Sequence, residues 1–272
     1  MQRCCPDRTK GVKSPGIYTP PAFGSHVQIT AIDNSTPLTQ ARITRVQGIV
    51  GCILYYARAI DSTMYPAVTH IASLMANPTQ HVEDMADRLL AYAYLYPNNK
   101  LVFTKCDMIL HIQSDASYLS RPCGRSVGGG IQYLGNLNEP TQINGPCHVI
   151  SKVIDVVVAS AAESEYAGVF INAQSGEWTR SILRAIGHIQ PPTIILSDNA
   201  CAVGLATDSV KIKRSKSIDM RFHWIRDRVR QGHFRVIWRK GANNLADFFT
   251  KVIPVHQHQA TMPLLVQVGH RK

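Results

Sequence analysis

Two short apolar runs with β-strand character each end at an aspartate, and this feature constrains the fold more than any other. Residues 108–114 run into Asp115, and residues 193–197 run into Asp198. Similar patterns predict further strands at 128–134, 149–153 and 234–238. Helices are predicted from Ser160 to about residue 176, over 219–230, and in a short segment entered at Asn243 or Asn244. Strands and helices that alternate in this way predict an α/β fold, with helices covering a mixed sheet.

The first hundred residues follow a different pattern. Residues 1–41 are rich in Pro, Thr, Ser and Gly and are expected to form an extended or disordered lead-in. Apolar residues at helical spacing then predict helices around 46–57 and 82–93, with a third helix over 66–76 between them. The expected organisation is therefore a lead-in (1–41), a helical module (42–104), an α/β domain (105–254) and a tail (255–272).

Positive charge is concentrated in one segment of the α/β domain. Residues 211–240 contain eleven Lys and Arg against two Asp, a net charge of +9 out of +11 for the whole chain. Such an excess favours a polyanionic partner, with nucleic acid ahead of an acidic membrane surface. A solvated basic helix face is the alternative. Lys216, Arg221, Arg226 and Arg230 are the candidate phosphate contacts, while His223 and Trp224 are expected to be packing residues.

Cysteine usage and hydropathy bear on the compartment. Seven cysteines occur without a Cys-x-x-Cys pair or zinc-ligand spacing, which favours reduced thiols. No apolar run approaches the ~20 residues that a membrane helix needs. The charged N-terminus is not followed by the apolar stretch of a secretory signal. We therefore expect an intracellular protein, cytoplasmic or nuclear, that is not secreted and has no membrane partner.

The two aspartates at the strand ends are candidate metal ligands. If their strands are neighbours in the sheet, their carboxylates come close together, and two such charges repel unless a cation lies between them. Clustered carboxylate oxygens suit Mg²⁺ or Mn²⁺. Each residue alone has a structural alternative, because Asp198 could cap a helix and Asp115 could form a turn.

Two further carboxylates join this set. Glu163 lies three residues after Ser160, the spacing of a helix capping box, which gives it a structural role. Glu165 lies about 200° around the same helix from Glu163 and leads into its apolar body, so it is the better ligand candidate. Asp247 falls in the first turn of the last predicted helix, where its alternative role is to complement the helix dipole.

These same residues carry a resemblance to a known family. Four segments are involved, together with the basic segment 214–226 and the upstream segment 46–57: Ser114–Tyr118, Ser160–Tyr166, Ser197–Asn199 and Asn244–Lys251. In this order they closely resemble the C-terminal part of the Pol polyprotein of copia-type LTR retrotransposons, namely the end of the reverse transcriptase and the ribonuclease H domain. The resemblance spans roughly residues 42–254.

The resemblance implies a fold, a site and a reaction. It implies a ribonuclease H-like α/β fold preceded by a remnant of the reverse transcriptase thumb or connection in residues 42–104. Asp115, Glu165, Asp198 and Asp247 would be the catalytic, metal-binding tetrad, holding two Mg²⁺ or Mn²⁺ ions and no organic cofactor. The implied activity is hydrolysis of the RNA strand of RNA–DNA hybrids. The implied partners are such a hybrid and the polymerase part of the polyprotein.

Three departures from the family pattern bear on function. The chain has no Tyr-x-Asp-Asp polymerase block, so no DNA synthesis is expected from it. Many ribonucleases H carry a mobile His before the last helix, but the loop 239–243 contains none. The chain also starts inside what would be a longer polyprotein, which keeps open an inactive, nucleic-acid-binding remnant as the alternative function.

Overall fold

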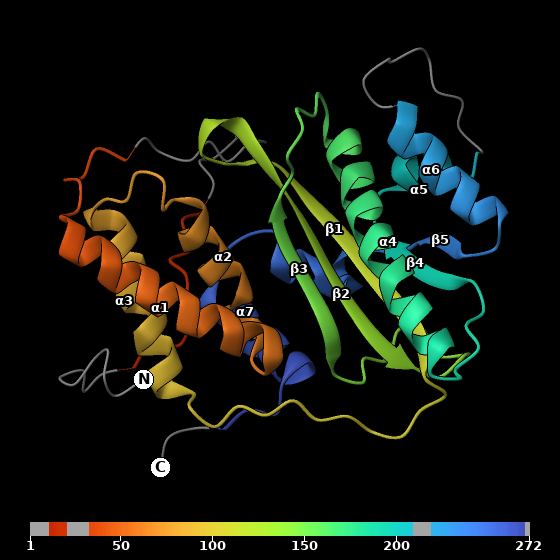
Figure 1. Cartoon of the computed structure of the whole chain (residues 1–272), viewed down its shortest axis with the longest axis horizontal. Helices are drawn as coiled ribbons and strands as arrows, with labels where there is room; N and C mark the ends of the chain where they lie inside the picture. The colour runs from red at the N-terminus through yellow and green to blue at the C-terminus, as the bar shows by residue number, and fades with distance from the viewer. Residues whose placement is uncertain (1–10, 21–32, 209–218, 270–272) are drawn as a thin grey trace. The chain divides into compact units, whose positions relative to one another are not determined.

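The computed structural model describes residues 11–20, 33–208 and 219–269. The chain forms two compact units, shown in Figure 1. The helical unit takes its residues from 1–102 and 251–272, and the sheet unit spans residues 103–250. No described helix is both long enough and apolar enough to cross a membrane.

The helical unit is built on three helices that the sequence predicts. They are α1 (Gln40–Ala59), α2 (Tyr65–Ser73) and α3 (Gln80–Leu95), and a short 3-10 turn, η1 (Ser62–Met64), precedes α2. The apolar stripe expected in α1 is buried at Val46, Ile49, Val50, Ile53 and Ala57. Parts of the predicted lead-in also pack here: the Val12 amide donates to the Ala91 carbonyl, and Leu38 is buried.

The sequence predicts a tail after residue 254, but residues Val255–Leu265 form a helix, α7, in the helical unit. Its His258 and Met262 are buried and both lie against the hydroxyl of Tyr92 in α3, at 3.0 Å each. The tail expectation is therefore wrong for this segment. The sequence does not predict this helix because Pro263 disfavours helix at that position and only three residues of the segment are buried, one of them a histidine.

The sheet unit contains a five-stranded mixed sheet with the order β3-β2-β1-β4-β5. The strands are β1 (Ile109–Arg121), β2 (Arg125–Gly135), β3 (Pro146–Val153), β4 (Thr193–Ser197) and β5 (Phe234–Trp238). The first three pair antiparallel, as successive hairpins do, whereas β4 and β5 run parallel to β1. Helices connect the parallel strands, as parallel pairing requires.

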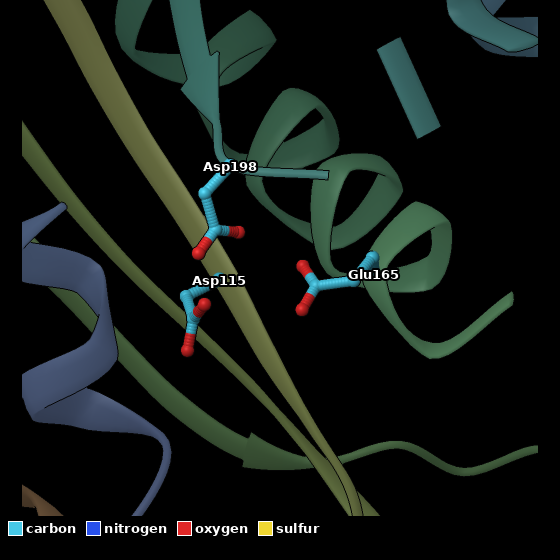
Figure 2. Close-up of side chains that lie close together, drawn as sticks. All are labelled: Asp115, Glu165 and Asp198. Atoms are coloured by element: carbon cyan, nitrogen blue, oxygen red, sulfur yellow. The ribbon is translucent and has the colours of Figure 1, made fainter. Parts of the chain in front are cut away.

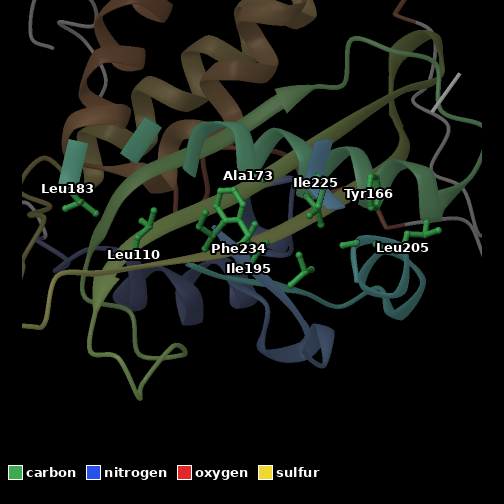
Figure 3. Packing of buried hydrophobic residues seen from close by; sticks show 13 residues of the cluster. Leu110, Tyr166, Ala173, Leu183, Ile195, Leu205, Ile225 and Phe234 are labelled. Atoms are coloured by element: carbon green, nitrogen blue, oxygen red, sulfur yellow. The ribbon is translucent and has the colours of Figure 1, made fainter. Parts of the chain in front are cut away.

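Helices α4 (Ala161–Ala185), α5 (Ala200–Ala206) and α6 (Asp219–Arg230) enclose the main core on one face of this sheet. Figure 3 shows this core, in which Leu110, Ile195 and Phe234 of the strands meet Tyr166 and Ala173 of α4. Two short 3-10 segments, η3 (Gly241–Asn243) and η4 (Leu245–Phe249), follow β5, and η2 (Pro122–Gly124) joins β1 to β2.

Consecutive glycines in β2 show that α4 and η4 lie on opposite faces of the sheet. A Cβ atom on Gly128 or Gly130 would meet side chains of α4, whereas one on Gly129 would lie 2.5 Å from Thr250 Cγ2, just after η4. Side chains alternate between the two faces along a strand, so neighbouring residues point to opposite layers. The absence of side chains at these positions lets both layers approach the sheet at the level of Asp115, which pairs with Gly129.

Candidate metal centre

Three carboxylates from three separate elements converge at one edge of β1. Asp115 comes from β1, Glu165 from the first turns of α4, and Asp198 from the residue after β4. One oxygen of each lies within 4.8 Å of the others, and Figure 2 shows the three side chains directed toward a shared space. Three of the four ligands expected from the sequence thus meet in the described part of the chain.

The register of the sheet explains why Asp115 and Asp198 meet. The parallel pairing of β1 with β4 ends at Gln113↔Leu196, and each aspartate lies two residues beyond that pair. The two strands run in the same direction, so both aspartates arrive at the same level. Asp198 does not cap the helix that follows, because Asn199 is the N-cap of α5 and accepts from the Ala202 amide at 3.0 Å.

The expectation that Asp115 lies at the end of its strand was wrong. Asp115 does not end its strand, since β1 continues to Arg121 through its pairing with β2. The strand that ends at this level is β4, and its end leaves one edge of β1 open beyond Gln113. Glu165 takes up this edge: its carboxylate accepts a hydrogen bond from the Ala116 amide.

Glu163 and Glu165 have the separate roles that the helix-capping argument predicted. The Ser160 hydroxyl accepts from the Glu163 amide at 3.2 Å, while the Glu163 carboxylate accepts from the Ala159 amide at 2.6 Å. These bonds satisfy free amides at the start of α4. Glu163 is therefore committed to the helix end, and Glu165 is the carboxylate of this segment that joins the cluster.

Burial and repulsion disfavour the charged form of Glu165. Desolvation is the main cause, followed by the charges of Asp115, Asp198 and, more weakly, Asp247, and together they raise the pKa of Glu165 to about 9. Its Oε2 atom is buried and has no hydrogen-bond partner among the described residues. A buried carboxylate oxygen without a donor is energetically costly unless a cation or proton compensates it.

Asp247 stands apart from the group of three. It lies in the first turn of η4, as expected, and is partly exposed. No oxygen of Asp247 joins the described cluster within 4.8 Å, although its charge is near enough to raise the pKa of Glu165. The structure therefore brings this fourth carboxylate to the neighbourhood of the site without placing it in the cluster.

Polar contacts between η4 and β1 support Asp115, and the sequence reasoning did not single them out. The Thr250 hydroxyl donates to Asp115 Oδ2 at 2.8 Å, and the Asn244 side chain donates to the Ser114 carbonyl at 2.8 Å. The Leu245 amide donates to Gln113 Oε1 at 2.8 Å. The available signal was the position of Asn244 and Thr250 on either side of Asp247, three residues away in each direction.

The donor set fits a hard divalent cation. All three side chains offer carboxylate oxygens, which are the ligands that Mg²⁺ and Mn²⁺ prefer. The unpartnered Glu165 Oε2 and the mutual repulsion of the three groups would both be relieved by a positive ion between them. Asp115, Glu165 and Asp198 are therefore the residues that could hold the metal.

The basic segment is only partly described. Lys216 lies outside the described residues, and so does the side chain of Arg221. Arg226 is largely buried, donates to the Leu205 carbonyl at 2.7 Å and pairs with Asp208 at 3.1 Å, so it ties α6 to the end of α5. Arg230 also pairs with Asp208, at 2.8 Å, but 69% of its side chain is exposed.

The two aromatic residues of α6 behave differently. Trp224 packs edge-on against Phe170 of α4 with ring centroids 5.5 Å apart, which confirms the packing role expected for it. His223 is exposed, so the same expectation is wrong for His223. The residues lie next to each other on a helix, and only one of them can face α4.

The sheet topology and the flanking helices define the class of domain. The α/β fold expected from the sequence, a ribonuclease H-like mixed sheet with flanking helices, is confirmed in the sheet unit. The carboxylate cluster lies where β1 and β4 part. No protein-family model matches the chain.

Curated proteins of similar sequence are Pol polyproteins of transposons. The chain is 30% identical over 247 residues to the retrovirus-related Pol polyprotein from transposon RE1 of Arabidopsis thaliana, a match covering 90% of this chain. It is 31% identical over 211 residues to that from RE2 of the same plant, covering 76% of the chain. A Nicotiana tabacum polyprotein, from transposon TNT 1-94, is 26% identical over 220 residues. The resemblance is thereby confirmed: this chain is a relative of the copia-type Pol polyproteins.

The match covers only a small part of those relatives. The chain spans 16% of the RE1 polyprotein and 14% of the RE2 polyprotein. Among solved structures, an RNase H1 in complex with an RNA/DNA hybrid aligns with a TM-score of 0.38 at 14% identity, over 52% of this chain and 93% of that one. A foamy viral protease-reverse transcriptase in complex with an RNA/DNA hybrid aligns at 0.41 and 13%, over 80% of this chain and 28% of that one.

Proposed function

We propose that this chain is a metal-dependent ribonuclease H, an endonuclease that hydrolyses the RNA strand of RNA–DNA hybrids as part of a retrotransposon polyprotein. The observation that carries the proposal is the convergence of Asp115, Glu165 and Asp198 within 4.8 Å on a ribonuclease H-like sheet. Its relatives, which are Pol polyproteins, support the same reading. An RNA–DNA hybrid is the proposed substrate, and the polymerase part of the polyprotein is the proposed partner.

The three clustered carboxylates would hold Mg²⁺ or Mn²⁺, with Asp247 completing a site for two ions. Divalent ions in such a site lower the pKa of an attacking water and stabilise the leaving oxygen of a phosphodiester. The chain contributes fixed ligands: Asp115 is held by Thr250, and Glu165 is held by the Ala116 amide. Glu165 must lose its proton before both of its oxygens can act as ligands, because its pKa is raised to about 9.

Hybrid binding is assigned to the basic segment. Phosphate contacts from Lys216, Arg221 and Arg230 are proposed, and Arg226 is a weaker candidate since its guanidinium is engaged with Leu205 and Asp208. Binding through these side chains would weaken as the salt concentration rises. A nucleic-acid substrate of this kind also supports the proposal of an intracellular protein.

The test is cleavage of a labelled RNA–DNA hybrid in Mg²⁺ and in Mn²⁺. Asp115→Asn and Asp198→Asn are expected to lower the rate by a factor of 100 or more, on the order of 3 kcal/mol in the barrier. Asp155→Asn is the matched control, because Asp155 is an exposed acid of the same unit that pairs with Lys152 on the surface, away from the clustered carboxylates. Full activity in both ligand variants would overturn the proposal.

The alternative is an inactive remnant that still binds nucleic acid. The Arg226–Asp208 contact keeps α6 attached to the sheet unit, so the basic segment could persist without catalysis. Salt-sensitive binding of the hybrid with no turnover in Mn²⁺ would favour this alternative. The inactive remnant predicts no turnover even in the wild type, whereas the enzyme predicts turnover in the wild type that the ligand variants lose.

A further inference from the structure

We propose that Thr250 is a positioning residue that fixes the carboxylate of Asp115 for metal binding. The inference rests on the proposed function, and it assigns a role to a side chain outside the carboxylate set. Thr250 follows η4, whereas Asp115 lies in the middle of β1, 135 residues earlier. The contact between them therefore depends on the fold rather than on local sequence.

The hydrogen bond joins two buried groups. Thr250 Oγ1 donates to Asp115 Oδ2 at 2.8 Å, and the two residues are 1% and 5% exposed. A hydroxyl that donates to a buried carboxylate makes one of the stronger hydrogen bonds in proteins. It restricts rotation of the Asp115 carboxylate.

A second acceptor for the Thr250 hydroxyl, the Asp247 carbonyl, lies 3.0 Å from Oγ1. That carbonyl already accepts the Thr250 amide at 3.3 Å. The Asp115 carboxylate is both the shorter and the charged acceptor, so the hydroxyl donates to it preferentially. The same residue thus links Asp115 to the turn that carries Asp247.

The surroundings hold Thr250 in place. Ser117, two residues after Asp115 in β1, donates to the Thr250 carbonyl at 3.1 Å. The Thr250 methyl group lies over Gly129, where a Cβ atom would come within 2.5 Å of it. Gly129 is the register partner of Asp115, so the space for Thr250 and the carboxylate it contacts lie at the same level of the sheet. The arrangement is a preorganised support for a metal ligand.

Two pairs of variants isolate the hydroxyl. Thr250 and Thr250→Val have the same shape but differ in the hydroxyl, and Thr250→Ser and Thr250→Ala differ in the same way without the methyl group. Mn²⁺ binding to the whole chain, in the absence of nucleic acid, is measured by calorimetry for each. Removal of the hydroxyl is expected to weaken Mn²⁺ binding roughly 10- to 100-fold in each pair, the usual effect of losing a support to a metal ligand.

Kinetics separate positioning from folding. With the hydroxyl removed, kcat for hybrid cleavage should fall at low Mn²⁺ and recover partly at high Mn²⁺, while KM for the hybrid stays within about twofold. Thr250→Ser should retain near wild-type metal affinity. Ser117→Ala is the control for the backbone tether, because it removes the bond to the Thr250 carbonyl and leaves the hydroxyl in place. It should weaken Mn²⁺ binding less than Thr250→Val does.

The outcomes are distinct. Equal Mn²⁺ affinity within both pairs overturns the inference and leaves the proposed function intact. Thr250→Ser that binds Mn²⁺ as weakly as Thr250→Ala also overturns it, because the methyl packing would then be what matters. If Thr250→Val does not fold, the Ser and Ala pair decides alone. A wild type that neither binds Mn²⁺ nor cleaves the hybrid overturns the proposed function and this inference with it.

Discussion

The carboxyl group of Glu165 lies where burial, and then the charges of three neighbouring aspartates, disfavour its charged form. Its pKa of about 9 exceeds the ordinary value of 4.5, so the folded state binds the proton more tightly than the unfolded state does. Such a group makes its full contribution to the free energy of unfolding at low pH, where it is protonated in both the folded and the unfolded state. This stabilisation is lost as the pH rises from about 4.5 to about 9.

We therefore expect the metal-free sheet unit to lose stability between pH 5 and pH 8.5. Glu165→Gln removes the charge, so this variant should lose less and be more stable than the wild type at pH 8.5 by roughly 1 kcal/mol or more, the equivalent of one pKa unit. Urea unfolding followed by tryptophan fluorescence measures it, because Trp178, Trp224 and Trp238, the chain's three tryptophans, all lie in the sheet unit. A difference in stability between the wild type and Glu165→Gln that does not change with pH would contradict this prediction.

Local rules explain which site residues the sequence could indicate. Glu163 and Glu165 were told apart by capping geometry, which depends on neighbours within one helix turn. Asp115 and Asp198 were indicated by the apolar runs before them. Thr250 could not be found in this way, because its partner is 135 residues away and the contact requires the packing of η4 on the sheet.

At the scale of elements, close packing of α4 on β2 depends on the lack of a side chain at Gly130. A Cβ atom there would come 1.7 Å from Asn172 Oδ1. Asn172 is fully buried in α4, and its amide donates to the Gly129 carbonyl at 2.9 Å and to the Gly168 carbonyl at 3.0 Å. The helix cannot keep these bonds and also accommodate a methyl group.

Gly130→Ala is therefore expected to destabilise the sheet unit by about 2–3 kcal/mol, through overpacking and loss of a buried hydrogen bond. Gly128→Ala is the control on the same face of β2. A Cβ atom at Gly128 would meet the flexible end of Ile171 at 3.3 Å, so this change should cost less than about 1 kcal/mol. Urea unfolding by tryptophan fluorescence compares the two. Equal losses in both variants would show that the close approach to Asn172 is not what matters.

The two short apolar runs that turns delimit were predicted at their observed bounds, whereas the predictions for α4 and β1 were too short. β4 and β5 match the predicted ranges 193–197 and 234–238, because turns delimit both runs. β1 extends six residues past Asp115 because β2 continues to pair with it there. No local pattern in the sequence of β1 predicts this extension. α7 was missed because Pro263 and its few apolar positions resemble a tail.

At the scale of the whole molecule, each unit has its own core, and the carboxylate cluster belongs entirely to the sheet unit. The clustered ligands come from β1, α4 and the end of β4, whereas the buried apolar residues of α1 and α3 have no share in the site. A ligand that binds the folded state stabilises the structure that forms its site. Metal binding should therefore act on one unit and leave the other nearly unchanged.

Hydrogen exchange in the presence and absence of Mg²⁺ or Mn²⁺ tests this expectation. Backbone amides of β1, β4 and the first turns of α4 should exchange more slowly when metal is added at about 100 times its Kd, where the stabilisation approaches 2.7 kcal/mol, or about 100-fold in exchange rate. Amides of α1 and α3 should change by less than about twofold. Asp198→Asn should abolish the difference, while Asp155→Asn should retain it, because Asp155 lies on the surface of the same unit. Protection that rises equally in both units would mean that the metal acts on the chain as a whole, and a site formed only by three carboxylates of the sheet unit could not account for that.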